Sequence, residues 1–383
     1  MPTRLESFFL RKTSTAYVQL DALDGLRGIA VLLVVLSHLS NADLFLLPGL
    51  DFRGTGKYGV YLFFSLSAFL LTRPLLRDDA DLVAPRGWIR YALRRALRIL
   101  PLYWLVLFTN WAVTQWAPTP AMPSLTTDEW IGHLLFQQGK GVYWTIPVEV
   151  SYYFVLPFVA ATYRALRLEL VAISCATGAA IAFALLVWPV PEDVRDSLNV
   201  GVYLPIFLLG SYAAAVDTHW NTKRPDSVPR RKHVATALAL LGALGIAAIS
   251  PAGASLIVSQ ELPKDWMHGH TLPFGLAWAA VVLGTLHGAA WLERGLSLRA
   301  LRLIGVVSFS VYLWHIPVAR SIVLLGLGNP WLVAWAIVVA SVAVGIVSFA
   351  LVEWPFTRSA FVERGIRRIG RSEGDAPDEP RAQ

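Results

Sequence analysis

Ten stretches of this 383-residue chain are apolar and long enough to cross a lipid bilayer, and they constrain its fold more than any other feature. A transmembrane helix needs about 20 largely apolar residues to cross a hydrocarbon core of about 30 Å. The windows that meet this requirement are 23–42, 57–73, 99–117, 142–162, 168–189, 199–216, 233–251, 271–291, 303–325 and 330–352. With 55% hydrophobic and only 15% charged residues, the chain is too apolar for a water-soluble domain of this size. We therefore expect an all-α integral membrane protein, a bundle of about ten transmembrane helices.

Lysine and arginine residues are distributed unevenly between the two sides of these windows. Of the 33 Lys and Arg residues, 26 lie in the N-terminal segment, in alternate loops and in the C-terminal tail. The opposite segments hold only Arg53, Lys57, Lys140, Arg195 and Lys264. Because Lys and Arg are enriched in cytoplasmic loops, this pattern places both termini in the cytoplasm. We predict a multi-pass protein of the inner (cytoplasmic) membrane.

The same distribution accounts for the net charge of +7, so nucleic acid is not an expected partner, whereas membrane lipid is. No small-residue cleavage signature follows the first window, which we interpret as a retained helix. The predicted organisation is a cytoplasmic N-terminal segment (1–20), a transmembrane domain (21–358) and a cytoplasmic, disordered tail (359–383). A lone Cys175 excludes a disulfide within the chain and a thiolate metal cluster.

Ionisable side chains inside the windows mark the candidate site, since charge at membrane depth is costly and by default functional. His38 follows Arg27 by eleven residues, which returns to nearly the same helix face roughly 16 Å further on. Glu149 is expected about 10 Å below the outer boundary, at a depth similar to that of His38. Ser67 lies near that level, and His315 approaches mid-membrane from the other side.

A buried histidine and a carboxylate at one depth suit general acid/base catalysis, because imidazole can accept a hydroxyl proton near neutral pH while the carboxylate orients it. A transporter or flippase that relays protons or substrate through His38, Glu149 and His315 would look similar. For His38 alone, a helix-packing hydrogen bond is the structural alternative. No metal is expected, because the histidines inside the windows lie on separate spans without a ligand pair on one helix face.

The stretch 87–100 alternates apolar residues with four arginines and predicts a basic amphipathic helix on the inner membrane surface. Arg95 and Arg98 share one face of it just before Pro101, where they could form a guanidinium fork for phosphates. Binding to anionic lipid is the alternative, and composition alone favours it. If these arginines bind phosphate, a nucleotide-bearing cofactor such as coenzyme A docks from the cytoplasm.

Several short blocks occur in a fixed order. They are LDGLRGIA (23–30) followed by His38, FFSLSAFLLT (63–72), RRALRILP (94–101), WTIPVE (144–149) followed by Tyr152 and Tyr153, SFSVYLWHIP (308–317) and VEWPF (352–356). Together they resemble the acyltransferase 3 family of membrane O-acyltransferases, over roughly residues 20–360. The most specific element of the resemblance is the pair Arg27 and His38, with ten residues between them.

The resemblance implies a bundle of about ten helices that uses acyl-coenzyme A as donor. It implies that His38 is the essential histidine, and that Arg27, Arg95, Arg98 and Glu149 occupy functional positions. We expect His38 and Glu149 to be catalytic and the three arginines to bind the donor. Contacts with the substrate are predicted for Ser65, Ser67, Trp144, Tyr153 and His315.

The predicted function is transfer of an acyl group, acetyl in the first instance, from acyl-coenzyme A to a hydroxyl of a cell-surface or lipid-linked carbohydrate. His38 would act as general base or would carry the acyl group itself. A macrolide-like small molecule is the alternative acceptor. Some family members carry an extracytoplasmic domain that completes transfer. We expect this chain either to acetylate its acceptor directly or to hand the acetyl group to a separate extracytoplasmic partner. A structural membrane subunit would explain the topology but not the buried His and Glu.

Overall fold

The computed structural model describes residues 21–76, 85–190, 197–223 and 228–358, and over these ranges it is helical with no strands. The segment 1–20 and the tail 359–383 lie outside the described residues. In chain order the helices are α2 (Asp21–Asn41), α3 (Gly56–Leu75), α4 (Pro85–Trp116), α5 (Thr127–Leu134), η1 (Gly141–Trp144), α6 (Thr145–Ala165), α7 (Leu170–Val187), α8 (Val200–Lys223), α9 (Val228–Ala248), α10 (Pro251–Val258), α11 (Thr271–His287), α12 (Ala290–Leu296), α13 (Arg299–Val306), α14 (Ser308–Val323), α15 (Pro330–Ser348), η3 (Phe349–Glu353) and α16 (Trp354–Arg358).

Seven of these helices are long and apolar enough to cross a membrane, and three bent pairs raise the number to ten if each pair forms one span. The pairs are α9 with α10, α11 with α12, and α13 with α14, bent by 77°, 106° and 78°. Every predicted window coincides with one of these helices or pairs. The prediction of an all-α, multi-pass membrane protein is confirmed, while the orientation of the termini stays a prediction.

One expectation differs from the structure at the third span. The basic stretch 87–100, expected as an amphipathic helix on the inner membrane surface, is helical, but it continues without a break into the following span as the 32-residue helix α4. Pro101 lies inside this helix. A proline removes one backbone hydrogen bond, and α4 tolerates that loss without ending. Arg95 and Arg98 consequently belong to a helix that enters the bundle.

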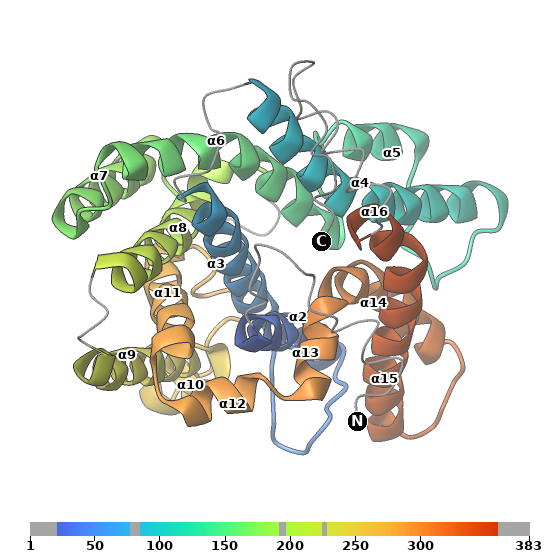
Figure 1. The fold of residues 1–383 in the computed structure, drawn as a ribbon. Coiled ribbons are helices and arrows are strands. Elements are labelled where there is room, and N and C mark those ends of the chain that lie inside the picture. The colour runs from blue at the N-terminus through green and yellow to red at the C-terminus, as the bar shows by residue number, and fades with distance from the viewer. Residues whose placement is uncertain (1–20, 77–84, 191–196, 224–227, 359–383) are drawn as a thin grey trace, which may run out of the picture.

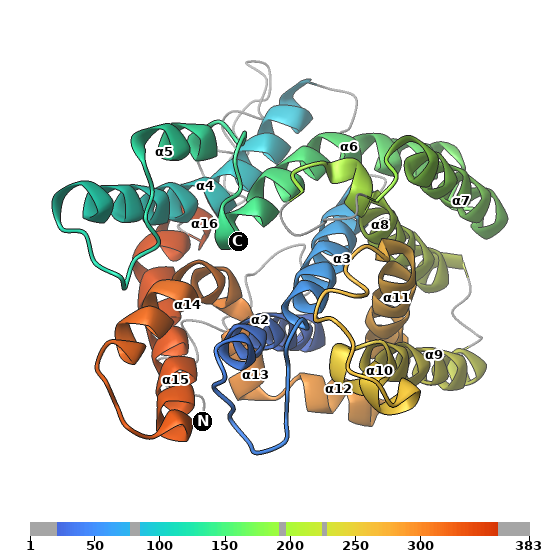
Figure 2. The ribbon, with the colours of Figure 1, turned by 180° about the vertical axis from the view of Figure 1, so that it is seen from behind.

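Helices α2 and α3 occupy the interior of the molecule. In both views they lie between the other helices, with α7 and α9 toward one end and α15 toward the other (Figure 1, Figure 2). Helix α2 packs against α3, α13 and α14, and α3 packs against α8, α11 and α6. The outer helices keep large apolar side chains exposed, such as Phe183 and Leu186 on α7, which suits contact with lipid rather than water.

Glycines allow α2 and α13 to approach backbone to backbone. A Cβ atom at Gly305 would collide with the carbonyl oxygen of Asp24, and one at Gly28 with the carbonyl oxygen of Leu301. Small residues at such crossings permit the close packing that holds membrane helices together. This contact fixes the start of α2, and hence Arg27, against the bend that begins α14.

We expect Gly305→Ala to lower stability by about 1–3 kcal/mol, because the added methyl group would force the two backbones apart. The measurement is the apparent melting temperature of purified protein in detergent. Gly178→Ala is the matched control, since Gly178 lies exposed on α7 with open space around it and alanine favours helix there. Equal melting temperatures for the two variants would contradict a tight α2–α13 contact.

Candidate active site

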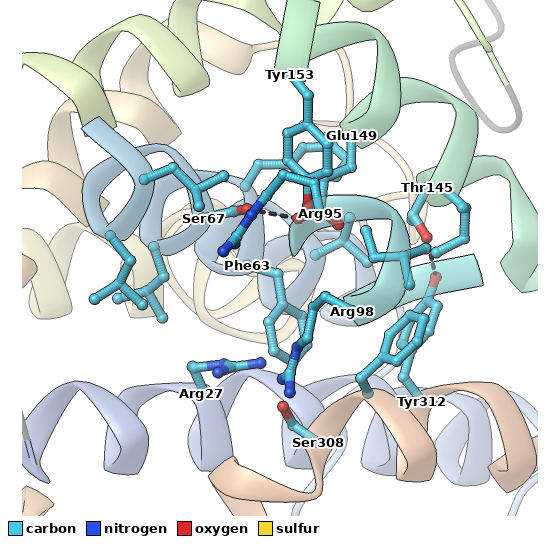
Figure 3. A pocket seen from close by; sticks show the side chains of 18 residues that line it. Arg27, Phe63, Ser67, Arg95, Arg98, Thr145, Glu149, Tyr153, Ser308 and Tyr312 are labelled. Atoms are coloured by element: carbon cyan, nitrogen blue, oxygen red, sulfur yellow. Dashed lines mark hydrogen bonds between the residues drawn. The ribbon is translucent and has the colours of Figure 1, made fainter. Parts of the chain in front are cut away.

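A pocket of about 140 Å³ lies where α2, α3, α4, α6 and α14 meet. Apolar side chains such as Phe63 and Ile99 form part of its wall. The polar residues that line it are Arg27, Ser67, Arg95, Arg98, Thr145, Glu149, Tyr153, Ser308 and Tyr312 (Figure 3). Residues far apart in the sequence therefore converge, and they include all three arginines and the glutamate predicted from the sequence.

The charge of this pocket is predominantly positive. Arg27 comes from α2 and Arg95 and Arg98 from α4, and Glu149 on α6 is the acidic residue among the lining side chains. The guanidinium groups of Arg27 and Arg98 point toward the same region beside Ser308 (Figure 3). Guanidinium groups present several donors in a planar fork that matches phosphate or carboxylate oxygens. Such a pocket suits an anionic ligand.

Glu149 is held by two hydroxyl groups. Its Oε1 accepts hydrogen bonds from Ser67 Oγ at 2.5 Å and from the Tyr153 hydroxyl at 2.7 Å. Ser67 belongs to α3 and Tyr153 lies one turn further along α6. Hydrogen bonds donated to an ionised carboxylate are stronger than those between neutral groups. These two bonds fix the orientation of the carboxylate in the pocket.

Arg98 is paired with a buried acidic residue that the sequence analysis did not single out. Its Nη1 lies 3.3 Å from Oε2 of Glu353, whose side chain is 1% exposed. Ser310 Oγ donates to Oε1 of the same carboxylate at 2.5 Å. Glu353 ends the π-helical segment η3, and π-helical turns occur often at functional sites. The last apolar window ends at residue 352, just before Glu353. The VEWPF block, which contains Glu353, was therefore the only sequence feature that pointed to this residue.

Arg95 differs from Arg98 in its surroundings. Its Nε is buried, and this nitrogen has no hydrogen-bond partner among the residues that the structure describes. A buried donor without a partner costs free energy, and a bound ligand can supply the missing acceptor. Arg95 is thus the lining cation whose hydrogen-bonding capacity is most clearly unfilled.

His38 lies outside the lining of the pocket and faces another histidine. Its ring centroid is 5.1 Å from that of His315, and the two planes are tilted by 42°. His38 is exposed although Ser37 and Leu39 on either side of it are buried. Within the described residues no hydrogen bond joins His38 to Glu149. The carboxylate expected to orient His38 is instead bonded to Ser67 and Tyr153.

Tyr312 stands between the pocket and the histidine pair. It lines the pocket, and its ring centroid lies 5.9 Å from that of His315. The Tyr312 hydroxyl donates to the carbonyl oxygen of Val142 at 2.8 Å and accepts from Thr145 Oγ1 at 3.2 Å. These bonds tie α14 to the junction of η1 and α6. Tyr312 therefore contacts both the pocket and the histidine pair.

The remaining predicted substrate contacts separate into two groups. Ser67 and Tyr153 line the pocket. Ser65 is fully buried where α3 meets α8, and Trp144 packs against Tyr203 with the Lys57 ammonium 4.3 Å from its ring centroid. The structure thus brings Ser67 and Tyr153 to Glu149, whereas Ser65 and Trp144 pack between helices.

Comparison with known proteins identifies the class of this chain. The family model described as an acyltransferase domain matches residues 20–350. A Komagataeibacter xylinus protein named as a membrane-bound transacylase is 28% identical over 316 residues, which cover 77% of this chain and 72% of that protein. A Bacillus subtilis (strain 168) protein named as a peptidoglycan O-acetyltransferase is 27% identical over 90% of this chain and 57% of its own length.

A peptidoglycan O-acetyltransferase of Listeria monocytogenes is 24% identical over 92% of this chain and 58% of its own length. The chain therefore spans less than two thirds of both peptidoglycan O-acetyltransferases. No solved structure matches the chain. The family match covers most of the sequence, including every residue that lines the pocket. The chain belongs to the acyltransferase 3 family and is a membrane acyltransferase, as its motifs predicted.

Proposed function

We propose that this acyltransferase moves an acetyl group, or another short acyl group, from acyl-coenzyme A to a hydroxyl of a cell-surface or lipid-linked carbohydrate. The observation that carries the proposal is the pocket in which Arg27, Arg95 and Arg98 meet a single lining carboxylate. Coenzyme A carries phosphate groups, which guanidinium forks bind well. The predicted topology places the entrance of the donor on the cytoplasmic side of the inner membrane.

His38 is the reactive group in this proposal. In one route its neutral imidazole takes the proton of the acceptor hydroxyl while the oxygen bonds to the acyl carbon. The carbon–sulfur bond then breaks, and the proton passes to the departing coenzyme A thiolate. In the other route a His38 nitrogen bonds to the acyl carbon, the carbon–sulfur bond breaks, and the coenzyme A thiolate leaves with the ring N–H proton. The acceptor oxygen then bonds to the acyl carbon, the carbon–nitrogen bond breaks, and His38 keeps the hydroxyl proton. The accessibility of His38, beside the pocket but outside its lining, supports both routes.

The acceptor is proposed from the relatives. Two of them are named for O-acetylation of peptidoglycan, a polymer rich in sugar hydroxyls. A glycan of the cell envelope, free or attached to lipid, therefore ranks first, and a macrolide-like small molecule is the alternative. A separate extracytoplasmic protein that completes the transfer also belongs to the proposal.

The test is release of free coenzyme A by the purified chain in nanodiscs, supplied with acetyl-coenzyme A and an envelope extract of glycans and lipids. We expect release that depends on the extract, with labelled acetyl recovered in a glycan fraction. Free coenzyme A should be measured by chromatography. A thiol reagent is unsuitable, because it would also react with the exposed Cys175. Empty nanodiscs are the control. Donor that is neither bound nor consumed would contradict the proposal.

A further inference from the structure

We propose that His315 positions His38 for the reaction, by accepting through its Nε2 a hydrogen bond from a ring N–H of His38. The inference rests on the proposed function and assigns the orienting role to a neutral imidazole on α14 instead of a carboxylate. The other nitrogen of His38 then presents its lone pair to the acceptor hydroxyl.

The proton of His315 is located by its backbone contact. Its Nδ1 lies 2.7 Å from the carbonyl oxygen of Tyr312, three residues earlier on α14. A carbonyl oxygen only accepts hydrogen bonds, so Nδ1 carries the proton of the neutral ring. The lone pair therefore lies on Nε2, which makes this atom an acceptor.

That acceptor is buried and unfilled. The His315 side chain is 1% exposed, and its Nε2 has no hydrogen-bond partner in the described part of the chain. Buried polar atoms are nearly always paired, and an unpaired one costs free energy. The Nε2 atom of His315 therefore lacks a hydrogen-bond donor.

His38 is the adjacent group that can donate this hydrogen bond to Nε2 of His315. A separation of 5.1 Å between ring centroids is short enough for a nitrogen of each ring to come within hydrogen-bonding distance after rotation of one ring. His38 is the ring free to rotate, because it is exposed while His315 is enclosed and bonded to its own helix. The bond would form as His38 turns toward an acceptor.

The contact also suits the charge that develops during transfer. When the hydroxyl proton moves to His38, the ring becomes a cation, and a hydrogen bond donated by that cation is stronger than one donated by the neutral ring. The acceptor oxygen bonds to the acyl carbon, the carbon–sulfur bond breaks, and the coenzyme A thiolate receives the proton from His38. His315 keeps its own proton on Nδ1 throughout. Glu149 stays bonded to Ser67 and Tyr153.

Two substitutions separate this role from simple packing. In His315→Asn the amide nitrogen lies near the position of Nδ1 and can still donate to the Tyr312 carbonyl. This variant has no acceptor atom at the position of Nε2 to receive a hydrogen bond from His38. In His315→Gln the amide oxygen extends toward the position of Nε2 and can accept from His38. We expect kcat to fall about 100-fold in the Asn variant, as for loss of an oriented general base, and by much less in the Gln variant. KM for acetyl-coenzyme A should stay unchanged in both.

The outcomes distinguish this inference from the function on which it rests. An inactive wild-type chain would overturn the proposed function itself. An active wild type with an equally active Asn variant, or with Asn and Gln variants impaired alike, would overturn only the role of His315. Nitrogen NMR of histidine-labelled wild-type protein gives a test that needs no active variant. The resonance lost in His315→Gln should report a proton on Nδ1, and a proton on Nε2 would refute the inference.

Discussion

Replacing His38 with alanine is expected to lower acyl transfer by a factor of about 10²–10⁴, the usual contribution of a positioned acid/base group. The affinity for acetyl-coenzyme A should be unchanged, because His38 does not line the pocket that holds the arginines. The measurement pairs the rate of coenzyme A release with the equilibrium binding of labelled donor. A fall in rate at constant affinity would place His38 in the chemical step.

His233→Ala is the matched control for this experiment. His233 is also a histidine on a predicted span, but it lies exposed on α9 at the edge of the molecule. Its replacement should leave both rate and affinity unchanged. A folded His38→Ala protein with full activity would eliminate the general-base and the acyl-carrier routes together.

Replacing Arg95 with alanine is the second large effect that we expect. Hydrogen bonds to charged groups contribute about 1.5–3 kcal/mol, so the Kd and KM for acetyl-coenzyme A should rise by roughly 10- to 150-fold. The weaker binding of acetyl-coenzyme A should be measurable even when no acyl acceptor is present. Arg95→Lys should recover only part of it, because an ammonium group lacks the planar fork of guanidinium.

Arg94→Ala removes the same charge from the neighbouring position of α4 and serves as the control. Arg94 is exposed and does not line the pocket. Its loss should weaken donor binding only slightly, through the long-range field, and that weakening should disappear at high salt. Equal losses in the two variants would mean that the positive charge of α4 acts as a whole and that the pocket does not select the ligand.

Helix positions were largely predictable because length and hydropathy control them. Each apolar window became a helix or a bent pair, but the bends themselves were less visible. The break before α10 has a local cause, since Ser250 caps that helix and Pro251 begins it. The bend at Val307 lacks such a signal, and it depends on tertiary packing of α13 against α2.

The neighbours of a side chain did not follow from its predicted depth. The sequence placed His38 and Glu149 at similar levels in the membrane, and depth follows from counting residues along a helix. Which neighbour a side chain meets depends also on how each helix is rotated and packed, and a single sequence does not contain that information. Glu149 therefore meets Ser67 and Tyr153, and His38 meets His315. Arg27, Arg95 and Arg98 line one pocket, as their assignment to the donor requires, while binding of the donor stays a prediction.

The 78° bend between α13 and α14 has a consequence for anion binding that no arginine provides. Because of it, α14 begins at the pocket, where Ser308 and Phe309 form part of the lining. The first N–H groups of a helix have no partners within the helix and carry a partial positive charge. This charge belongs to the main chain, so substitution of side chains leaves it in place. The partial charge would therefore remain beside Glu149 in variants that lack the arginines, and it would be lost if α13 and α14 joined into one straight helix.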